Sequence, residues 1–263
     1  MVSRAATCLS VLVLTEDSGA KAFETLRNLA KELLKQVDEY VQTNRISFEP
    51  VRNELALQAL HANLWKSTKP RERQKQVELI RTIATQVMLE EGWVLFHFDG
   101  DRSWDSRESS ENMEKFQKLV CDRVRELVVS KLMEQHLNDT TPEELETRAR
   151  ARMTRLKSVV PFYSIEAWLF QNTREALRLC QERYGGRDVE QFEAWAQDRG
   201  ALDEVLKPKE AVCLGAAHNL DLASNGFPTR EVRAVGKSFE ATVQSLSQDA
   251  ELRQALAQTY SYG

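Results

Sequence analysis

The sequence has few cysteines and no long hydrophobic run, and each shortage argues against a class of protein. Its four cysteines include no C-x-x-C pair, so we expect neither a zinc cluster nor a disulfide-dense secreted scaffold, but four reduced thiols, mostly buried. No stretch approaches the roughly 18–20 apolar residues that a membrane-spanning helix needs. These shortages predict a cytoplasmic protein with no membrane partner. The cysteines are Cys8, Cys121, Cys180 and Cys213.

An excess of charge of one sign is also missing. The chain of 263 residues carries 36 Lys+Arg against 40 Asp+Glu, a net charge of −4. This balance argues against a protein that coats nucleic acid through bulk charge, although it leaves room for a local basic groove. Apolar residues make up 42% of the chain, with only 10 glycines and 6 prolines, which excludes collagen-like, low-complexity and wholly disordered proteins.

Short apolar runs alternate with longer amphipathic segments along the chain. The runs at about 8–15, 93–98 and 159–165 are typical of buried strands, and Ile46–Val51 of an edge strand. The first run also resembles a short signal peptide after Arg4. It leads directly into acidic residues without a small-residue cleavage site, however, which favours a strand.

Helices are predicted between these strands and through the last third of the chain. Alternating strands and helices indicate an α/β fold with a mostly parallel sheet flanked by helices. We expect a core over residues 1–172 and a mainly helical C-terminal region, 173–263, packed on that core. The predicted helices lie at about 22–40, 53–65, 70–91, 111–136, 143–155, 173–184, 188–198, 208–217 and 236–258.

Acidic residues follow three of the predicted strands. Glu16 follows the first, Asp99 and Asp101 flank Gly100 after the second, and Glu166 follows the third. Ligands of parallel sheets bind at the carboxyl ends of the strands, so these side chains are expected to meet. Carboxylate oxygens are suitable ligands for Mg²⁺ or Mn²⁺. The pattern therefore predicts a metal site formed by Glu16, Asp99, Asp101 and Glu166.

The residues around this predicted site resemble the Toprim domain of topoisomerases, primases and overcoming-lysogenization-defect nucleases. The run V-L-V-L-T-E ends at Glu16, and V-L-F-H-F-D-G-D ends at Asp101. The segment F-Y-S-I-E-A-W-L-F, which contains Glu166, resembles the E-A-W segment of stand-alone Toprim-like proteins of bacterial defence. The resemblance covers about residues 8–170 and implies that the helices at about 53–91 are an insertion into the core, because the spacing between Glu16 and Asp99 is long for a minimal Toprim domain.

The resemblance implies a Toprim-like fold and a metal-dependent nuclease that hydrolyses phosphodiester bonds with Mg²⁺ or Mn²⁺. Glu16 would be the acid/base or metal glutamate, Asp99 and Asp101 metal ligands, and Glu166 a further ligand. DNA or RNA would be the substrate, and the role would be phage defence. ATP use would belong to a partner ATPase, because this chain has no ATPase motif, and an oligomer is compatible with the sequence.

Several basic residues and histidines are candidates for a role at this site. Lys237 follows Gly236 at a predicted helix start and is a candidate catalytic residue that stabilises charge on a phosphate. His218 is either a ligand or base or, more commonly for a lone histidine, a structural residue, and His97 belongs to the core. The run Arg148, Arg150, Arg152, Arg155 and Lys157 either contacts a phosphate backbone or forms a solvated helix face. A second run, expected to face solvent, comprises Lys66, Lys69, Arg71, Arg73 and Lys75.

Two other functions remain open. The strand that ends in D-G-D also resembles that of haloacid-dehalogenase-like phosphatases, in which Asp99 would be the nucleophile and Asp101 the acid/base. Alternatively, the chain is a non-catalytic interaction subunit whose acidic cluster is structural. Mutation of Asp99 or Glu16 would separate the nuclease from this last alternative.

Overall fold

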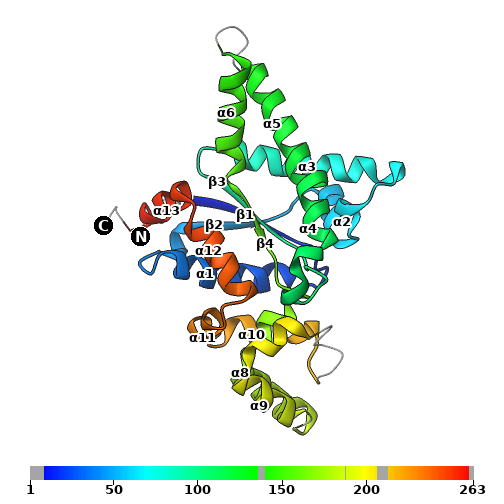
Figure 1. Ribbon diagram of the computed structural model, residues 1–263, viewed down its shortest axis with the longest axis vertical. Coiled ribbons are helices and arrows are strands. Elements are labelled where there is room, and N and C mark those ends of the chain that lie inside the picture. The colour runs from blue at the N-terminus through cyan, green and yellow to red at the C-terminus, as the bar shows by residue number, and fades with distance from the viewer. Residues whose placement is uncertain (1–8, 136–139, 187, 206–212, 261–263) are drawn as a thin grey trace, which may run out of the picture.

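A four-stranded, all-parallel sheet forms the centre of the protein (Figure 1). The computed structural model describes residues 9–135, 140–186, 188–205 and 213–260. The strand order is β2-β1-β3-β4, so the two most apolar strands, β1 and β3, are neighbours at the centre and β2 is an edge strand as predicted. The predicted α/β class is confirmed. The strands are β1 (Leu9–Thr15), β2 (Ile46–Pro50), β3 (Gly92–His97) and β4 (Leu156–Val159).

Both faces of the sheet are covered by helices. Successive side chains of a strand point to opposite faces, and Val11 and Leu95 belong to one hydrophobic cluster whereas Leu12 and Phe96 belong to the other. All six residues of β3 are buried. Burial on two faces explains why β3 is a continuous apolar run rather than an alternating one.

One face is covered by α1 together with the C-terminal helices (Figure 1). The apolar side of α1 carries Leu26, Leu29 and Leu33, which share a core with residues as far along the chain as Leu256. The C-terminal region therefore packs on the sheet as predicted. The helices are α1 (Ala22–Val37), α7 (Glu166–Leu169), α8 (Thr173–Tyr184), α9 (Val189–Gln197), α10 (Asn219–Ser224), α11 (Thr229–Ala234), α12 (Ser238–Ser247) and α13 (Ala250–Ala257).

The other face is covered by the predicted insertion and by the helices between β3 and β4. Trp65, Phe96, Phe98 and Phe116 form an aromatic cluster between these helices and the sheet. The last two helices of this group project away from the sheet as a pair (Figure 1). The helices are α2 (Glu54–His61), α3 (Arg73–Met88), α4 (Glu111–Phe116), α5 (Asp122–Gln135) and α6 (Pro142–Met153).

Some predicted helices differ from those observed. The helix expected at 111–136 contains a π-helical turn, Gln117–Cys121, between α4 and α5. The helix expected at 236–258 is divided into α12 and α13 by Asp249, whose side chain accepts a hydrogen bond from Leu252 N at 2.9 Å. Of the helix expected at 208–217, residues 208–212 lie outside the described residues, and α10 and α11 were not predicted.

The cysteines also depart from expectation. Cys180 and Cys213 form a disulfide, so the prediction of four reduced thiols is wrong for this pair. Cys121 is free, and burial raises the pKa of its thiol to about 12. Cys8 lies outside the described residues. Within those residues, no helix is both long and apolar enough to cross a membrane.

Candidate functional site

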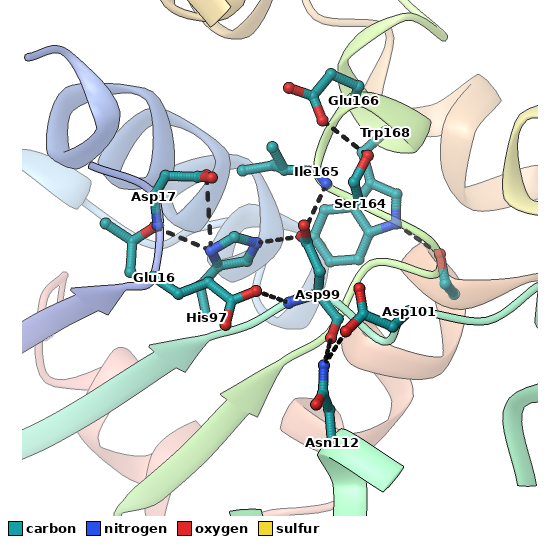
Figure 2. Close-up of polar contacts among 12 residues, drawn as sticks. Glu16, Asp17, His97, Asp99, Asp101, Asn112, Ser164, Ile165, Glu166 and Trp168 are labelled. Atoms are coloured by element: carbon teal, nitrogen blue, oxygen red, sulfur yellow. Dashed lines mark hydrogen bonds and ion pairs between the residues drawn. The ribbon is translucent and has the colours of Figure 1, made fainter. Parts of the chain in front are cut away.

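The carboxyl ends of β1 and β3 bring Glu16 and Asp99 together. The two strands pair with Thr15 opposite His97, and Glu16 N donates to His97 O at 3.3 Å just beyond the last pair. The Glu16 side chain then turns towards the next loop, where Oε1 accepts a hydrogen bond from Asp99 N at 2.9 Å (Figure 2). The sequence prediction that these two acidic positions lie side by side is therefore confirmed.

The loop after β3 is held against the segment after β4. Gly100 N donates to Pro161 O at 3.0 Å, which extends the contact between the two strands beyond their ends. A Cβ atom at Gly100 would lie 2.8 Å from the ring of Phe162, so only glycine fits without displacement of that ring. This close approach fixes where the two aspartates on either side of Gly100 can point.

Asp101 is oriented by its backbone and by Asn112. Its φ of 54° lies in the left-handed region, which aspartate tolerates better than most residues. Asn112 Nδ2 donates to Asp101 Oδ2 at 2.6 Å and to Asp99 O at 2.8 Å (Figure 2). Asn112 is buried at the start of α4, so it links the loop to a rigid element. The sequence analysis had not identified it.

A lysine lies between the two carboxylates. Lys66 Nζ is 3.7 Å from Glu16 Oε2 and 3.8 Å from Asp101 Oδ2, and its side chain is only 21% exposed. Trp65, the residue before it, donates from Nε1 to Glu16 Oε2 at 3.3 Å. Both belong to the short 3₁₀ turn η2 (Leu64–Lys66) between α2 and α3. The expectation that Lys66 faces solvent is thus wrong: the turn carries it into the site.

The carboxylate of Asp99 points away from Lys66 and towards a buried histidine. Asp99 Oδ1 accepts a hydrogen bond from Ile165 N at 3.2 Å and lies 3.6 Å from His97 Nε2 (Figure 2). On the other side of the ring, His97 Nδ1 is 3.0 Å from Thr15 Oγ1 and 4.0 Å from Asp17 Oδ2. His97, predicted as a core residue, is fully buried between two carboxylates.

This arrangement changes the proton affinity of both groups. Burial by itself lowers the pKa of His97, but the hydrogen bond and charge of Asp99 and the charges of Asp17 and Glu16 outweigh burial and raise it to about 9. Burial raises the pKa of Asp99 to about 7 against the opposing influence of His97. The carboxylates around His97 therefore favour its protonated imidazole.

Glu166 lies beside this cluster but has other partners. Its Oε2 accepts from Ser164 Oγ at 2.7 Å, and its Oε1 accepts from Asn219 Nδ2 at 3.2 Å. Glu166 and Asp17 line a cavity of about 590 Å³ at the start of α1. A larger cavity of about 660 Å³, between β2 and α3, contains none of the predicted site residues. Glu166 therefore borders the site through this cavity and does not join Glu16 and Asp101 around Lys66.

Lys237 and His218 also have partners outside the predicted site. Lys237 Nζ forms an ion pair with Glu204 Oε1 at 2.6 Å, and none of the four predicted metal-binding acids is its ion-pair partner among the described residues. His218 Nδ1 accepts from Gly215 N at 3.1 Å, and its Nε2 is 3.2 Å from Tyr184 Oη. These contacts stabilise the turn and are those of a structural histidine. The cation at the site is Lys66 rather than the predicted Lys237.

The side chains at the site can be compared with the ligands that the predicted metal requires. Glu16 and Asp101 are hard oxygen donors on either side of a position that the ammonium group of Lys66 already approaches. Mg²⁺ is typically bound through one or two carboxylates, with waters and substrate phosphates completing its shell, and the pair fits this requirement. Over the described ranges, no group of three or more His, Cys, Asp or Glu side chains could hold a metal ion by itself.

Comparisons with protein-family models, with curated proteins and with solved structures find no match to this chain. The Toprim resemblance therefore stays a prediction that depends on the short sequence runs around Glu16, Asp99 and Glu166. Chemical interpretation of the site depends on the contacts of its own side chains.

Proposed function

We propose that the protein is a metal-dependent nuclease that hydrolyses phosphodiester bonds at the carboxyl ends of β1 and β3. The observation that carries this proposal is the position of Lys66 Nζ between the carboxylates of Glu16 and Asp101. Two carboxylates and one cation around a shared space are suited to a phosphate group and a divalent ion together.

Each side chain has a distinct task in this proposal. Glu16 and Asp101 hold the divalent ion, and Lys66 contacts a non-bridging oxygen of the phosphate and stabilises its developing charge. Asp99 and His97 lie on the buried side of the site, and their contacts fix the loop that carries Asp101. When bound, Mg²⁺ or Mn²⁺ supplies Lewis-acid stabilisation of the reacting phosphate.

The environment of Asp99 disfavours the phosphatase alternative. A nucleophilic aspartate must present an ionised, open carboxylate to the substrate. Asp99 Oδ1 instead accepts a backbone hydrogen bond from Ile165 and lies 3.6 Å from the buried His97 Nε2, so the carboxylate is not open to a substrate. These properties support a positioning role for Asp99 over a nucleophilic one.

The wider role is proposed on the resemblance alone. On that basis we propose DNA or RNA as substrate, phage defence in the cytoplasm as the setting, and a partner ATPase as the source of any dependence on ATP. The candidate site supports the choice of a phosphodiester as the reacting group, since all three of its charged side chains are suited to phosphate and metal.

Paired substitutions test the nuclease. Glu16→Gln keeps an acceptor for Asp99 N, and Asp101→Asn keeps a partner for Asn112, so both should fold. With Mg²⁺ or Mn²⁺ and labelled single-stranded DNA, double-stranded DNA or RNA, we expect each variant to lose about 100-fold or more in cleavage rate, comparable to removal of a transition-state contact. Asp105→Asn, an exposed neighbour, is the matched control. Undiminished cleavage in both variants would leave the interaction-subunit alternative as the better one.

A further inference from the structure

A cavity lined by arginines lies at the opposite edge of the sheet from the carboxylates. It has a volume of about 450 Å³ and is bordered by the last residue of α3, the end of α5, the inner side of α6 and the start of α13. β3 and β4 begin at this edge. β3 runs from the cavity to the candidate site and spans about 20 Å at ~3.3 Å per residue. The residues on which the argument depends are Met88, Leu132, Arg148, Arg152, Arg155 and Glu251.

One of the three arginines is fully used within the protein. Arg155 Nε donates to Glu251 Oε1 at 2.7 Å, and Arg155 Nη1 donates to the carbonyl oxygens of Leu89 at 2.6 Å and Glu90 at 2.7 Å. The second carboxylate oxygen of Glu251 accepts from Thr154 Oγ1 at 3.1 Å. Among the described residues Glu251 is the only carboxylate that lines the cavity, and both of its oxygens are thus occupied.

The other two arginines lack a close ion pair among the described residues. Arg148 and Arg152 are one turn apart on α6, and neither forms an ion pair with an acidic side chain of the described chain; Arg152 has only a long hydrogen bond, 3.4 Å, to Leu89 O. Burial, followed by the charge of Arg155, lowers the pKa of Arg152, and the charges of Glu251 and Glu90 only partly oppose this shift. Like charges at this spacing destabilise a helix. A bound anion would relieve that repulsion.

Helix ends account for only part of this cluster. The carbonyl ends of helices attract cations, and this explains why Arg152 and Arg155 approach the carbonyl groups that follow α3. Arg148 lies further inside α6, and within the described part of the chain it donates to no carbonyl group. Arg150, between the two, forms an ion pair with Glu146 at 3.3 Å, whereas Glu144, one turn before Arg148, accepts its hydrogen bonds from Thr141.

We propose that this cavity binds a phosphorylated small molecule of nucleotide size. The phosphate oxygens lie between the guanidinium groups of Arg148 and Arg152, whose planar donors suit phosphate, and the apolar part packs against Met88 and Leu132. The volume falls in the usual range for small-molecule sites. The proposal is independent of the nuclease function, because the two sites are at opposite edges of the sheet.

Calorimetric titration of the full-length protein with ADP and with pyrophosphate tests this assignment. We expect both to bind, ADP more tightly because of its apolar part, and to raise the thermal midpoint. In the variant Arg148→Gln/Arg152→Gln the affinity for both should fall at least tenfold. Arg150→Gln, which removes a paired arginine from the same helix, should bind as the unmodified protein does. Circular dichroism checks the fold, and the single variant Arg148→Gln, at an exposed position, replaces the double variant if the latter unfolds.

Three results would overturn the proposal. One is no heat of binding with either phosphate up to millimolar concentration. Another is binding that the double variant retains. The last is a single-stranded oligonucleotide that binds through Arg148 and Arg152 while ADP and pyrophosphate do not, which would assign the cavity to a nucleic-acid backbone. None of these results depends on cleavage activity, so a failure here is distinct from a failure of the nuclease proposal.

Discussion

Lys66 is the side chain whose position most changes the interpretation of the sequence. It contacts both carboxylates that are proposed to hold the metal, and four-fifths of its side chain is shielded from solvent. If it stabilises charge on the phosphate, Lys66→Gln should reduce the rate of phosphodiester cleavage about 100-fold at saturating metal, the usual cost of one lost transition-state contact. The measurement is kcat with a labelled oligonucleotide.

Two companion variants separate charge from structure at this position. Lys66→Arg should retain part of the activity, because the positive charge remains. Lys69→Gln, on the same loop but with no ion pair to either carboxylate among the described residues, should cleave normally. A Lys66→Gln enzyme as fast as the Lys69→Gln enzyme would show that Lys66 only balances the charge of the acids.

His97 should make the stability of the protein depend on pH. Its pKa is raised to about 9 in the folded protein from an ordinary value of 6.5, so the folded state holds the proton more tightly. The resulting stabilisation is fully present below pH 6.5 and is lost as the pH rises through 9. The loss should be on the order of 3 kcal/mol in the free energy of unfolding.

Urea unfolding with a chelator present, at intervals from pH 6 to 9.5, measures this loss. The decrease of the unfolding free energy with rising pH should vanish in His97→Gln. His61→Gln is the control, because burial lowers the pKa of His61 and its contribution therefore has the opposite sign. An equally steep decline in His97→Gln would assign the pH dependence to other groups.

Sequence reasoning succeeded for residues fixed by strand ends and failed for those fixed by helix packing. Glu16 and Asp99 were predictable, because parallel strands that pair side by side end at the same edge. Lys66 and Asn112 were not, because their positions depend on how α2, α3 and α4 pack on the sheet. Lys237 satisfied a local rule about helix starts, but Glu204 is its partner.

The loop between β3 and α4 depends on close contact with the segment after β4. A Cβ at Gly100 would meet Phe162 at 2.8 Å, so Gly100→Ala must displace the ring or the loop. We expect a loss of about 1–3 kcal/mol in the free energy of unfolding, as for other overpacked sites, and a larger fall in cleavage than stability explains. Gly19→Ala, where an added Cβ meets no atom within 4 Å, should leave both unchanged. Denaturant unfolding and initial rates measure the two effects.

Helix positions were predicted better than helix continuity. The apolar period along 111–136 continues through the π-helical turn at Gln117–Cys121, so a pattern of burial alone does not reveal the turn. The break between α12 and α13 had a visible signal: Asp249 is a residue type that commonly caps a helix start, and its side chain does so here. Weighing caps together with periodicity would have divided this helix correctly.

The two edges of the sheet differ in charge. The carboxyl edge carries the acids around Lys66, whereas the amino edge carries the arginines of α6 and the start of β4. The net charge of −4 conceals this separation, since it sums groups from opposite ends of the molecule. Local charge is therefore the better guide to where a phosphate binds.

The C-terminal region completes the core rather than forming a separate body. Phe239, Val243 and Leu246 of α12 are each at most 1% exposed, and Phe239 packs edge-on against Trp168 with ring centroids 5.1 Å apart. In the full-length chain Phe239→Ala should cost about 3–5 kcal/mol of unfolding free energy, whereas Gln244→Ala, exposed on the same helix, should cost little.

A fragment of residues 1–172 tests the same interdependence of the two regions directly. Without the later helices, the apolar side of α1 and the ring of Trp168 lose their cover. We expect the fragment to show no cooperative thermal transition by circular dichroism, while the full-length chain unfolds in one step. A cooperative transition in the fragment near that of the full chain would mean that the sheet and its first helices form a domain by themselves. Phe239→Ala would then weaken only the attachment of α12, and cleavage by the fragment would locate the whole nuclease site before residue 173.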